Sequence, residues 1–128
     1  MDIIGLFQDQ TDYISIAAGQ TIFRDGDDGF VMYVLLEGVV DILVGEDLVE
    51  RANPGTIFGE MALIDSVPRS ATAVAYSDCR LFPIDAKKFD ALIQKTPDFA
   101  RHVMQTMANR IRNMNRRNLR LMEHSLRF

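Results

Sequence analysis

Up to Ile84 the chain consists of short apolar runs separated by polar turns that contain glycine. The runs occupy residues 30–36, 39–44, 48–49, 71–76 and 80–84. The Glu37-Gly38 turn between the first two runs predicts a β-hairpin, and Gly45-Glu46-Asp47 turns the chain again. Short strands with turn signals about every 8–12 residues are typical of an antiparallel barrel, roll or jelly roll. We therefore expect this part of the chain to be mainly β.

The hydrophobic pattern changes to a helical one after Asp85. This residue suits the N-cap of a short helix, in which apolar residues recur at i, i+3 and i+4. Thr96-Pro97-Asp98 then combines an N-cap, a first-turn proline and a first-turn acid, and predicts a second helix. No glycine or proline follows as far as Ser125, so this helix should have about 28 residues and a length of about 40 Å. We expect one domain: an antiparallel, jelly-roll-like β-roll with short flanking helices over residues 1–96, and a long arginine-rich α-helix over residues 97–128.

The long helix carries an apolar stripe that suits a second copy of the chain. Its members alternate in steps of three and four: Met104, Met107, Ile111, Met114, Asn118 and Leu121. In a coiled coil, an asparagine at a buried a position favours a paired, in-register dimer. The alternative is that the stripe packs on the β part. Because the helix is longer than a domain of this size, we expect a homodimer formed through this helix.

Charge is distributed unevenly along the chain. Residues 1–100 contain 7 Lys and Arg against 17 Asp and Glu, a net charge of −10, whereas residues 101–128 contain 7 Arg and one acid, a net charge of +6. Arginines 110, 112, 116, 117 and 120 could contact nucleic-acid phosphates without sequence preference. We expect them instead to form a solvated helix face or to pair with acids of the β part, so no nucleic-acid partner is predicted.

Several classes of protein are excluded by what the sequence lacks. No apolar run approaches the ~18–20 residues of a membrane span, and the N-terminus has no basic signal-peptide region, so we expect a cytoplasmic protein without a membrane partner. Cys79 is the only cysteine and should be a small core residue. His102 and His124 are too far apart to share a zinc ion, and Gly29 stands where a calcium loop needs a ligand. No nucleophile is paired with a base, so we expect neither an enzyme nor a bound metal or cofactor.

One short segment concentrates the residues that could bind a ligand. Gly59 allows backbone to come close to a ligand, and the amides of Met61 and Ala62, at the start of a helical turn, can point at an anion. The planar guanidinium of Arg69 suits a phosphate, whereas Glu60 has only acceptors and suits a sugar hydroxyl. An acceptor beside an anion site describes a site for a sugar phosphate. The alternative is a surface pair between the arginine and the glutamate.

The segments Phe58-Gly-Glu-Met-Ala-Leu-Ile64 and Pro68-Arg-Ser-Ala-Thr72 resemble the phosphate-binding cassette of the cyclic nucleotide-binding domain family. This family includes the regulatory subunits of cyclic-AMP-dependent protein kinase and the bacterial catabolite activator protein. The resemblance extends from about Ala18 to about Asn115, and the long helix is similar to the dimer helix of the bacterial activator. In the activators a helix-turn-helix domain follows this helix, whereas the sequence ends at Phe128, so no sequence-specific DNA binding is expected.

The resemblance implies a role for each residue of the cassette. Glu60 would accept a hydrogen bond from the ribose 2′-hydroxyl, and Arg69 would pair with the cyclic phosphate. The amides of Met61 and Ala62 and the hydroxyl of Ser70 would assist the arginine. The base would be flanked by apolar residues of the β part and met by residues of the long helix: Ile42, Val49, Phe58, Met114 and Asn115. The last of these could bond the Watson–Crick edge of a purine.

Ser70 bears on which nucleotide is bound. Within the family, a threonine at this position often accompanies cyclic GMP, an alanine accompanies cyclic AMP in the kinases, and a serine occurs in the bacterial cyclic-AMP activators. We therefore expect a non-catalytic cyclic-AMP sensor in signal transduction, in which phosphate capture at Arg69 changes the angle or pairing of the long helix. The alternatives are a regulator that binds cyclic GMP and a ligand-free module whose arginine-rich helix binds an acidic protein. The sequence does not identify a downstream partner.

Overall fold

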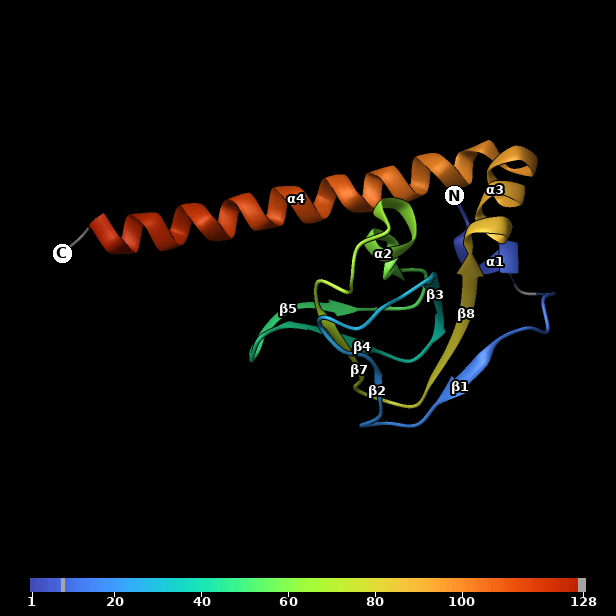
Figure 1. The fold of residues 1–128 in the computed structure, drawn as a ribbon, viewed down its shortest axis with the longest axis horizontal. Helices are drawn as coiled ribbons and strands as arrows, with labels where there is room; N and C mark the ends of the chain where they lie inside the picture. Colours follow the sequence, from blue (N-terminus) through green and yellow to red (C-terminus); the bar gives the residue numbers. More distant parts are fainter. Residues whose placement is uncertain (8, 127–128) are drawn as a thin grey trace.

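The computed structural model describes residues 1–7 and 9–126, and this part of the chain contains two four-stranded antiparallel sheets and four helices (Figure 1). Sheet 1 has the strand order β1 (Ile14–Ile16), β8 (Cys79–Asp85), β3 (Val31–Glu37), β6 (Ile57–Phe58). Sheet 2 has the order β2 (Thr21–Phe23), β7 (Thr72–Ala75), β4 (Val40–Val44), β5 (Asp47–Ala52). The helices are α1 (Ile3–Phe7), α2 (Glu60–Asp65), α3 (Ala86–Lys95) and α4 (Pro97–Leu126). The predicted β-roll with a long C-terminal helix is confirmed.

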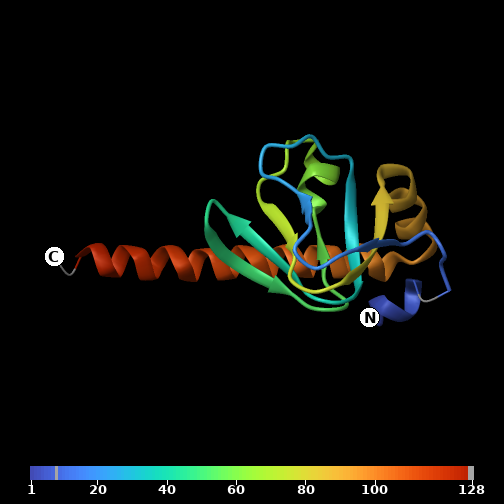
Figure 2. The same ribbon diagram turned by 90° about the horizontal axis from the view of Figure 1, so that it is seen from below.

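The hydrophobic core forms two layers on either side of sheet 1. One layer joins sheet 1 to the helices. In this layer the ring centroids of Phe82 and Phe99 lie 4.7 and 6.1 Å from that of Phe7. The other layer joins the two sheets and contains Leu35 of β3 and Val40 of β4. Cys79 is buried in this second layer, as predicted for a small core residue. Sheet 1 is therefore the middle layer, with the helices on one face and sheet 2 on the other (Figures 1 and 2).

The predicted hairpin between residues 30–36 and 39–44 is wrong. The strands β3 and β4 lie in different sheets: β3 pairs with β6 and β8, and β4 pairs with β5 and β7. Gly38 has φ 92°, and a Cβ there would lie 2.2 Å from the carbonyl oxygen of Asp78, so the chain makes a tight corner from one sheet to the other. The turn at Gly45 does close a hairpin, in which Val44 is the partner of Asp47.

Both predicted helix starts are confirmed. The Asp85 side chain accepts a hydrogen bond from the Lys88 amide at 2.8 Å and caps α3. The helix α4 begins at Pro97, where the proline ring already has a helical φ and its missing N–H is not needed. Phe99 and Val103 anchor the first turns of α4 in the helical layer of the core. These contacts fix the start of α4 against the core.

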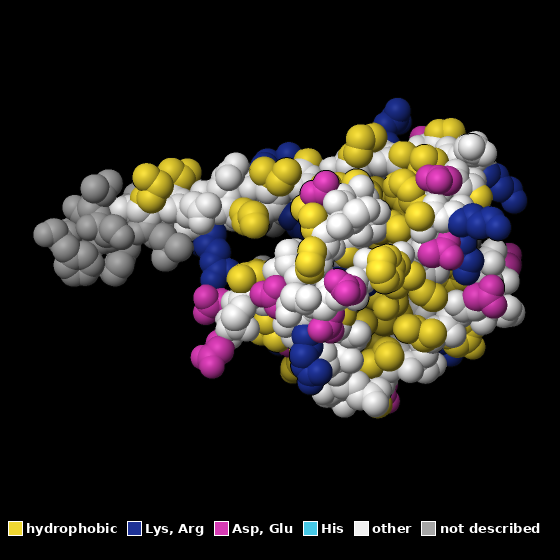
Figure 3. All heavy atoms as spheres, viewed as in Figure 1, with side chains coloured by type: hydrophobic (Ala, Val, Ile, Leu, Met, Phe, Trp, Pro, Cys, Tyr) yellow, Lys and Arg dark blue, Asp and Glu magenta, His cyan; other side chains and the backbone are white. Residues whose placement is uncertain are grey.

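Beyond these turns α4 runs along the β part and continues past the β4–β5 hairpin (Figures 1 and 2). Of the predicted stripe, Met107 packs against the helical layer of the core, whereas Met104, Ile111 and Met114 are exposed. Figure 3 shows such hydrophobic side chains spaced along the helix. Asn118 is also exposed. The side chains of residues 121 and 123–126 lie outside the described part of the chain, and so do the predictions for Leu121 and His124.

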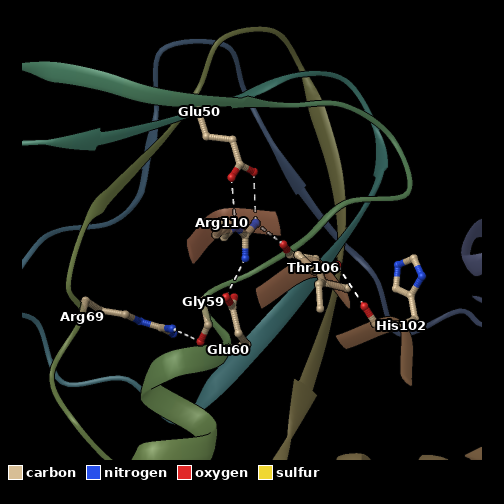
Figure 4. A network of polar contacts seen from close by, with 8 residues as sticks. Glu50, Gly59, Glu60, Arg69, His102, Thr106 and Arg110 are labelled. Atoms are coloured by element: carbon tan, nitrogen blue, oxygen red, sulfur yellow. Dashed lines mark hydrogen bonds and ion pairs between the residues drawn. The ribbon is translucent and has the colours of Figure 1, made fainter. Parts of the chain in front are cut away.

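None of the described helices combines the length and the apolar character that crossing a membrane requires. Among the described residues, no three or more His, Cys, Asp and Glu side chains gather in a way that could hold a metal ion. The chemically distinctive part of the structure lies instead where α2, the preceding strand β6 and the side of α4 meet (Figure 4).

Candidate functional site

The helix α2 begins at the segment that the sequence singles out. Gly59 precedes it with φ 78° and ψ 12°, a left-handed conformation that glycine adopts without steric cost. A Cβ at this position would lie 2.7 Å from Nη1 of Arg69, so a larger residue would displace this guanidinium. Ala62 is buried and Met61 is half-exposed in the first turn of α2. The amides of such a first turn have no acceptor within the helix.

Arg69 is buried, with 5% of its surface exposed. Its Nη1 donates to the carbonyl oxygen of Gly59 at 2.8 Å, and its Nη2 donates to that of Val31 at 2.7 Å. The guanidinium lies 4.2 Å from the centre of the Phe23 ring, a cation–π arrangement. Within the described residues, Nε of Arg69 is buried without a hydrogen-bond partner, and no carboxylate forms an ion pair with this side chain. Burial lowers the pKa of the guanidinium from its ordinary value.

The loop over residues 24–29 covers the same guanidinium. The backbones of Arg69 and this loop exchange two hydrogen bonds, from Gly26 N to Arg69 O and from Arg69 N to Asp27 O, each 2.8 Å long. A Cβ on Gly29 would lie 2.3 Å from Nε of Arg69. The loop that fails as a calcium site therefore forms one wall around a buried cation.

Glu60 is the other buried charged side chain of this region, with 4% of its surface exposed. Its Oε1 accepts a hydrogen bond from Nη1 of Arg110 on α4 at 2.6 Å (Figure 4). Arg110 also donates to both carboxylate oxygens of Glu50 on β5, at 2.8 and 3.0 Å, and to the carbonyl oxygen of Ile57 at 2.5 Å. We call Arg110, Glu50, Glu60 and the Ile57 carbonyl the Arg110 cluster. The guanidinium of Arg110 thus joins α4 to β5, to β6 and to the start of α2.

The pKa of Arg110 reflects two opposing effects. Burial lowers it, whereas hydrogen bonds and the charges of Glu50 and Glu60 raise it, and the net result is a raised pKa. From the sequence, Arg110 was one of several arginines expected to form a solvated face or to pair with acids of the β part. The structure shows the pairing, with Glu50 and Glu60. A second such pair joins Arg117 of α4 to Asp47 of β5 at 3.4 Å.

The remaining predicted site residues lie in different surroundings. Ser70 follows Arg69 and is exposed. Phe58 is buried between the sheets, with its ring centre 5.4 Å from that of Tyr33. The other four predicted contacts with the base lie on β4, on β5 and on α4: Ile42, half-buried, and Val49, Met114 and Asn115, exposed. The structure therefore brings Gly59, Glu60 and Arg69 close together. Arg110 and Glu50 also contact this region, although no local sequence motif predicted them as site residues.

A family model described as the cyclic nucleotide-binding domain matches residues 13–96. This match spans more than half of the 128 residues and includes the whole segment from Gly59 to Ser70. The chain belongs to the cyclic nucleotide-binding domain family. The resemblance inferred from the two cassette segments is therefore confirmed at the level of the family.

Three known proteins are similar to this chain over different shares of its length. A putative potassium channel protein of Rhodopseudomonas palustris is 40% identical over 104 residues, which are 78% of this chain and 25% of the channel protein. The Thermus thermophilus catabolite activator protein has 29% identity and a TM-score of 0.78, over 95% of this chain and 59% of that one. A solved structure from work on a cyclic-GMP-dependent signalling pathway that regulates bacterial phytopathogenesis has 34% identity and a TM-score of 0.69, over 79% of this chain and 84% of that one.

The matched segments make up 17%, 25% and 8% of the length of three curated relatives. Their names describe a cAMP-dependent protein kinase regulatory subunit, a putative potassium channel protein and a Rap guanine nucleotide exchange factor. The family match covers the segment that carries Glu60 and Arg69, whereas Arg110 lies after the matched residues, on α4.

Proposed function

We propose that the chain binds cyclic AMP at residues 59–70 and acts as a non-catalytic sensor whose output is the position of α4. The observation that carries this proposal is Arg69: a buried guanidinium with an unpartnered Nε and no ion pair among the described residues. A buried cation normally has an anionic partner, because removing a charge from water is costly. A cyclic phosphate is an anion of matching charge, and a planar guanidinium suits its oxygens.

Glu60 supplies the acceptor that a ribose needs. Its Oε1 is engaged by Arg110, whereas its Oε2 receives no hydrogen bond from the described residues. An ionised carboxylate accepts at both oxygens, so Oε2 remains for a ribose 2′-hydroxyl. The amides of Met61 and Ala62 and the hydroxyl of Ser70 complete the proposed phosphate site. The base then lies toward β4, β5 and α4, near Ile42, Val49, Phe58, Met114 and Asn115.

Cyclic GMP is the second candidate ligand. Ser70 favours cyclic AMP by the family resemblance, whereas the relative with 34% identity comes from work on a cyclic-GMP-dependent pathway. Asn115 has both a donor and an acceptor, so its side chain is compatible with either purine edge. Both nucleotides therefore belong in the first binding experiment.

The Arg110 cluster gives a physical route from the ligand to α4. A ribose bound at Glu60 changes the electrostatic surroundings of Arg110, which is itself part of α4. A ligand shifts a conformational equilibrium only by its differential affinity for the two states. Contacts between the base and Asn115 would add such a difference. Asn115→Ala should then weaken the response of α4 more than Arg69→Lys does, as read by a spin-label distance between α4 and sheet 2 in nucleotide-saturated protein.

The exposed apolar residues of α4 support a homodimer in which two copies of this helix pair. Met104, Ile111 and Met114 face solvent in the single chain and follow the spacing of a coiled coil. Analytical ultracentrifugation of the wild type and of Ile111→Asp tests this proposal. A dimer that Ile111→Asp converts to monomer supports it, and a wild-type monomer at every concentration overturns it.

The binding proposal is tested by calorimetric titration of cyclic AMP and of cyclic GMP into protein freed of bound nucleotide. We expect a Kd of about 1 μM or tighter, equivalent to about −8 kcal/mol. Arg69→Ala should abolish binding. Arg80→Ala is the matched control, because Arg80 lies outside the site and pairs with Glu37. No binding of either nucleotide by the wild type overturns the proposal and leaves α4 as the place to seek an acidic protein partner.

A further inference from the structure

We propose that Glu50 on β5 is a positioning residue for ribose recognition: it holds Arg110 so that Glu60 keeps one carboxylate oxygen free for the nucleotide. This inference rests on the proposed function and deepens it, because it concerns how selectively the site recognises a 2′-hydroxyl. Glu50 lies ten residues before Glu60 in the sequence, on strand β5, whereas Glu60 begins helix α2, so Glu50 is outside the segment that carries the cassette.

Arg110 divides its hydrogen bonds unequally. Three of them hold the guanidinium to the β part: Nε and Nη2 to the two oxygens of Glu50, and Nη2 to the Ile57 carbonyl. A single one, from Nη1, reaches Glu60. The bidentate contact with Glu50 fixes both the position and the plane of the guanidinium, because two parallel hydrogen bonds define its orientation. Glu60 therefore contacts one edge of the Arg110 guanidinium, and Glu50 sets the orientation of that guanidinium.

This division leaves Glu60 half-occupied. Its Oε1 accepts from Arg110, and its Oε2 receives no hydrogen bond from the described residues. An arginine facing a lone carboxylate prefers to engage both of its oxygens. If Glu50 lost its charge, Arg110 would turn toward Glu60 and take Oε2 as well. The ribose hydroxyl would then compete with a cation for the same oxygen.

The surroundings of the pair make this effect measurable. The side chains of Arg110 and Glu50 are 25% and 28% exposed, so water screens their interaction only in part. The pair between Arg117 and Asp47 lies farther along the same helix and strand, but its side chains are 45% and 74% exposed. Asp47 therefore offers a matched control: it is an acid on β5 that pairs with an arginine of α4 without contacting Glu60.

The test compares the affinities of cyclic AMP and of 2′-deoxy cyclic AMP, since these probes differ only in the 2′-hydroxyl. For the wild type we expect cyclic AMP to bind roughly tenfold or more tightly, the effect of one hydrogen bond to a charged group. Glu60→Gln should lower this ratio, because the neutral amide oxygen accepts a weaker hydrogen bond than the carboxylate does. Glu50→Gln should lower it at least about threefold, whereas Asp47→Asn should leave it unchanged. Where cyclic GMP is the ligand that binds, 2′-deoxy cyclic GMP takes the same place.

The affinity ratio separates a positioning role from a structural one. A variant that merely loosens the fold weakens both nucleotides alike and leaves the ratio unchanged. Glu50→Asp keeps the charge on a shorter side chain, and we expect its ratio to lie between those of the wild type and Glu50→Gln. Should Glu50→Gln fail to fold by circular dichroism, Glu50→Asp and Arg110→Lys carry the test by the same ratio, since a lysine cannot present a planar fork to both glutamates.

The outcomes distinguish this inference from the proposed function. An unchanged ratio in Glu50→Gln, with wild-type binding that depends on Arg69, overturns the role of Glu50 and leaves the nucleotide site standing. A wild type that binds both probes equally overturns the role of Glu50 and the ribose contact of Glu60. A wild type that binds neither cyclic AMP nor cyclic GMP overturns the proposed function and the inference with it.

Discussion

Replacing Arg110 with methionine should destabilise the fold, because it removes the cation that accompanies a buried carboxylate. Glu60 is almost fully buried, and Arg110 is the partner of its side chain among the described residues. Methionine matches much of the length and apolar volume of the arginine stem, so the packing of α4 against the β part is largely kept. The loss then falls mainly on the charge interactions with Glu60 and Glu50.

The magnitude follows from the burial of the two acids. Removing one partner of a buried ion pair costs about 3–5 kcal/mol. Glu50 can regain water because it is partly exposed, so we expect the lower end of this range, about 3 kcal/mol. An unfolding entropy of roughly 2.1 cal/mol/K per residue gives about 0.27 kcal/mol/K for 128 residues. The expected loss is therefore about 11 °C in Tm, and roughly 1.5–2 M in the urea midpoint.

Urea unfolding followed by circular dichroism measures this loss, and the double variant Arg110→Met/Glu60→Gln identifies its cause. Removing the charge of Glu60 together with its partner should recover at least about 1 kcal/mol of the loss, because no buried charge is then left alone. Two results would refute the reasoning: a single variant that loses less than about 1 kcal/mol, or a double variant that is no more stable than the single one.

Three further predictions concern residues outside the Arg110 cluster. Gly38→Ala should cost about 2 kcal/mol or more in urea unfolding, because φ is 92° and the new Cβ would meet the carbonyl of Asp78. The Cys79 thiol should resist Ellman's reagent in the native protein at pH 8 and react fully in guanidinium chloride, because burial raises its pKa. Its contribution to the free energy of unfolding is present below the ordinary thiol pKa of about 8.5 and declines as pH rises beyond it. Asp47→Asn should change the free energy of unfolding by less than about 0.5 kcal/mol, because its pair with Arg117 is exposed.

Local signals in the sequence predicted the starts of α3 and α4 well. The capping residue Asp85 and the Thr96-Pro97 start act within a few residues of themselves, so the chain around them is sufficient to identify the helix ends. The incorrect hairpin at Gly38 shows where such signals fail. A glycine turn between two apolar runs is compatible with a hairpin and with a corner between two sheets, and the choice depends on distant strands. Here β8 pairs with β3 and β7 pairs with β4, which holds the two runs apart.

The candidate site likewise contains residues that local sequence signals identify and residues that they do not. Gly59, Glu60 and Arg69 lie within eleven consecutive residues, so these residue types suggested a sugar-phosphate site from the sequence, with a surface pair of the arginine and the glutamate as the alternative. Arg110 lies 50 residues after Glu60, and Glu50 lies 60 residues before Arg110. Neither has a local pattern that marks it, because an arginine on an arginine-rich helix and a glutamate on a half-exposed strand look like ordinary surface residues. Only the packing of α4 beside β5 brings them together (Figure 4).

The way the fold treats its buried charges favours a ligand-binding site over a ligand-free interaction module. Within the described residues, the buried charged side chains are Glu60 and Arg69, which have opposite charges and lie nine positions apart. If they were structural, pairing them with each other would offset part of the cost of burying both. No ion pair joins them: Glu60 is held by Arg110, and Arg69 has two backbone carbonyls and an unpartnered Nε. A site for a molecule with an anion at one end and a hydroxyl donor at the other needs this separation, whereas an interaction surface on α4 has no use for it.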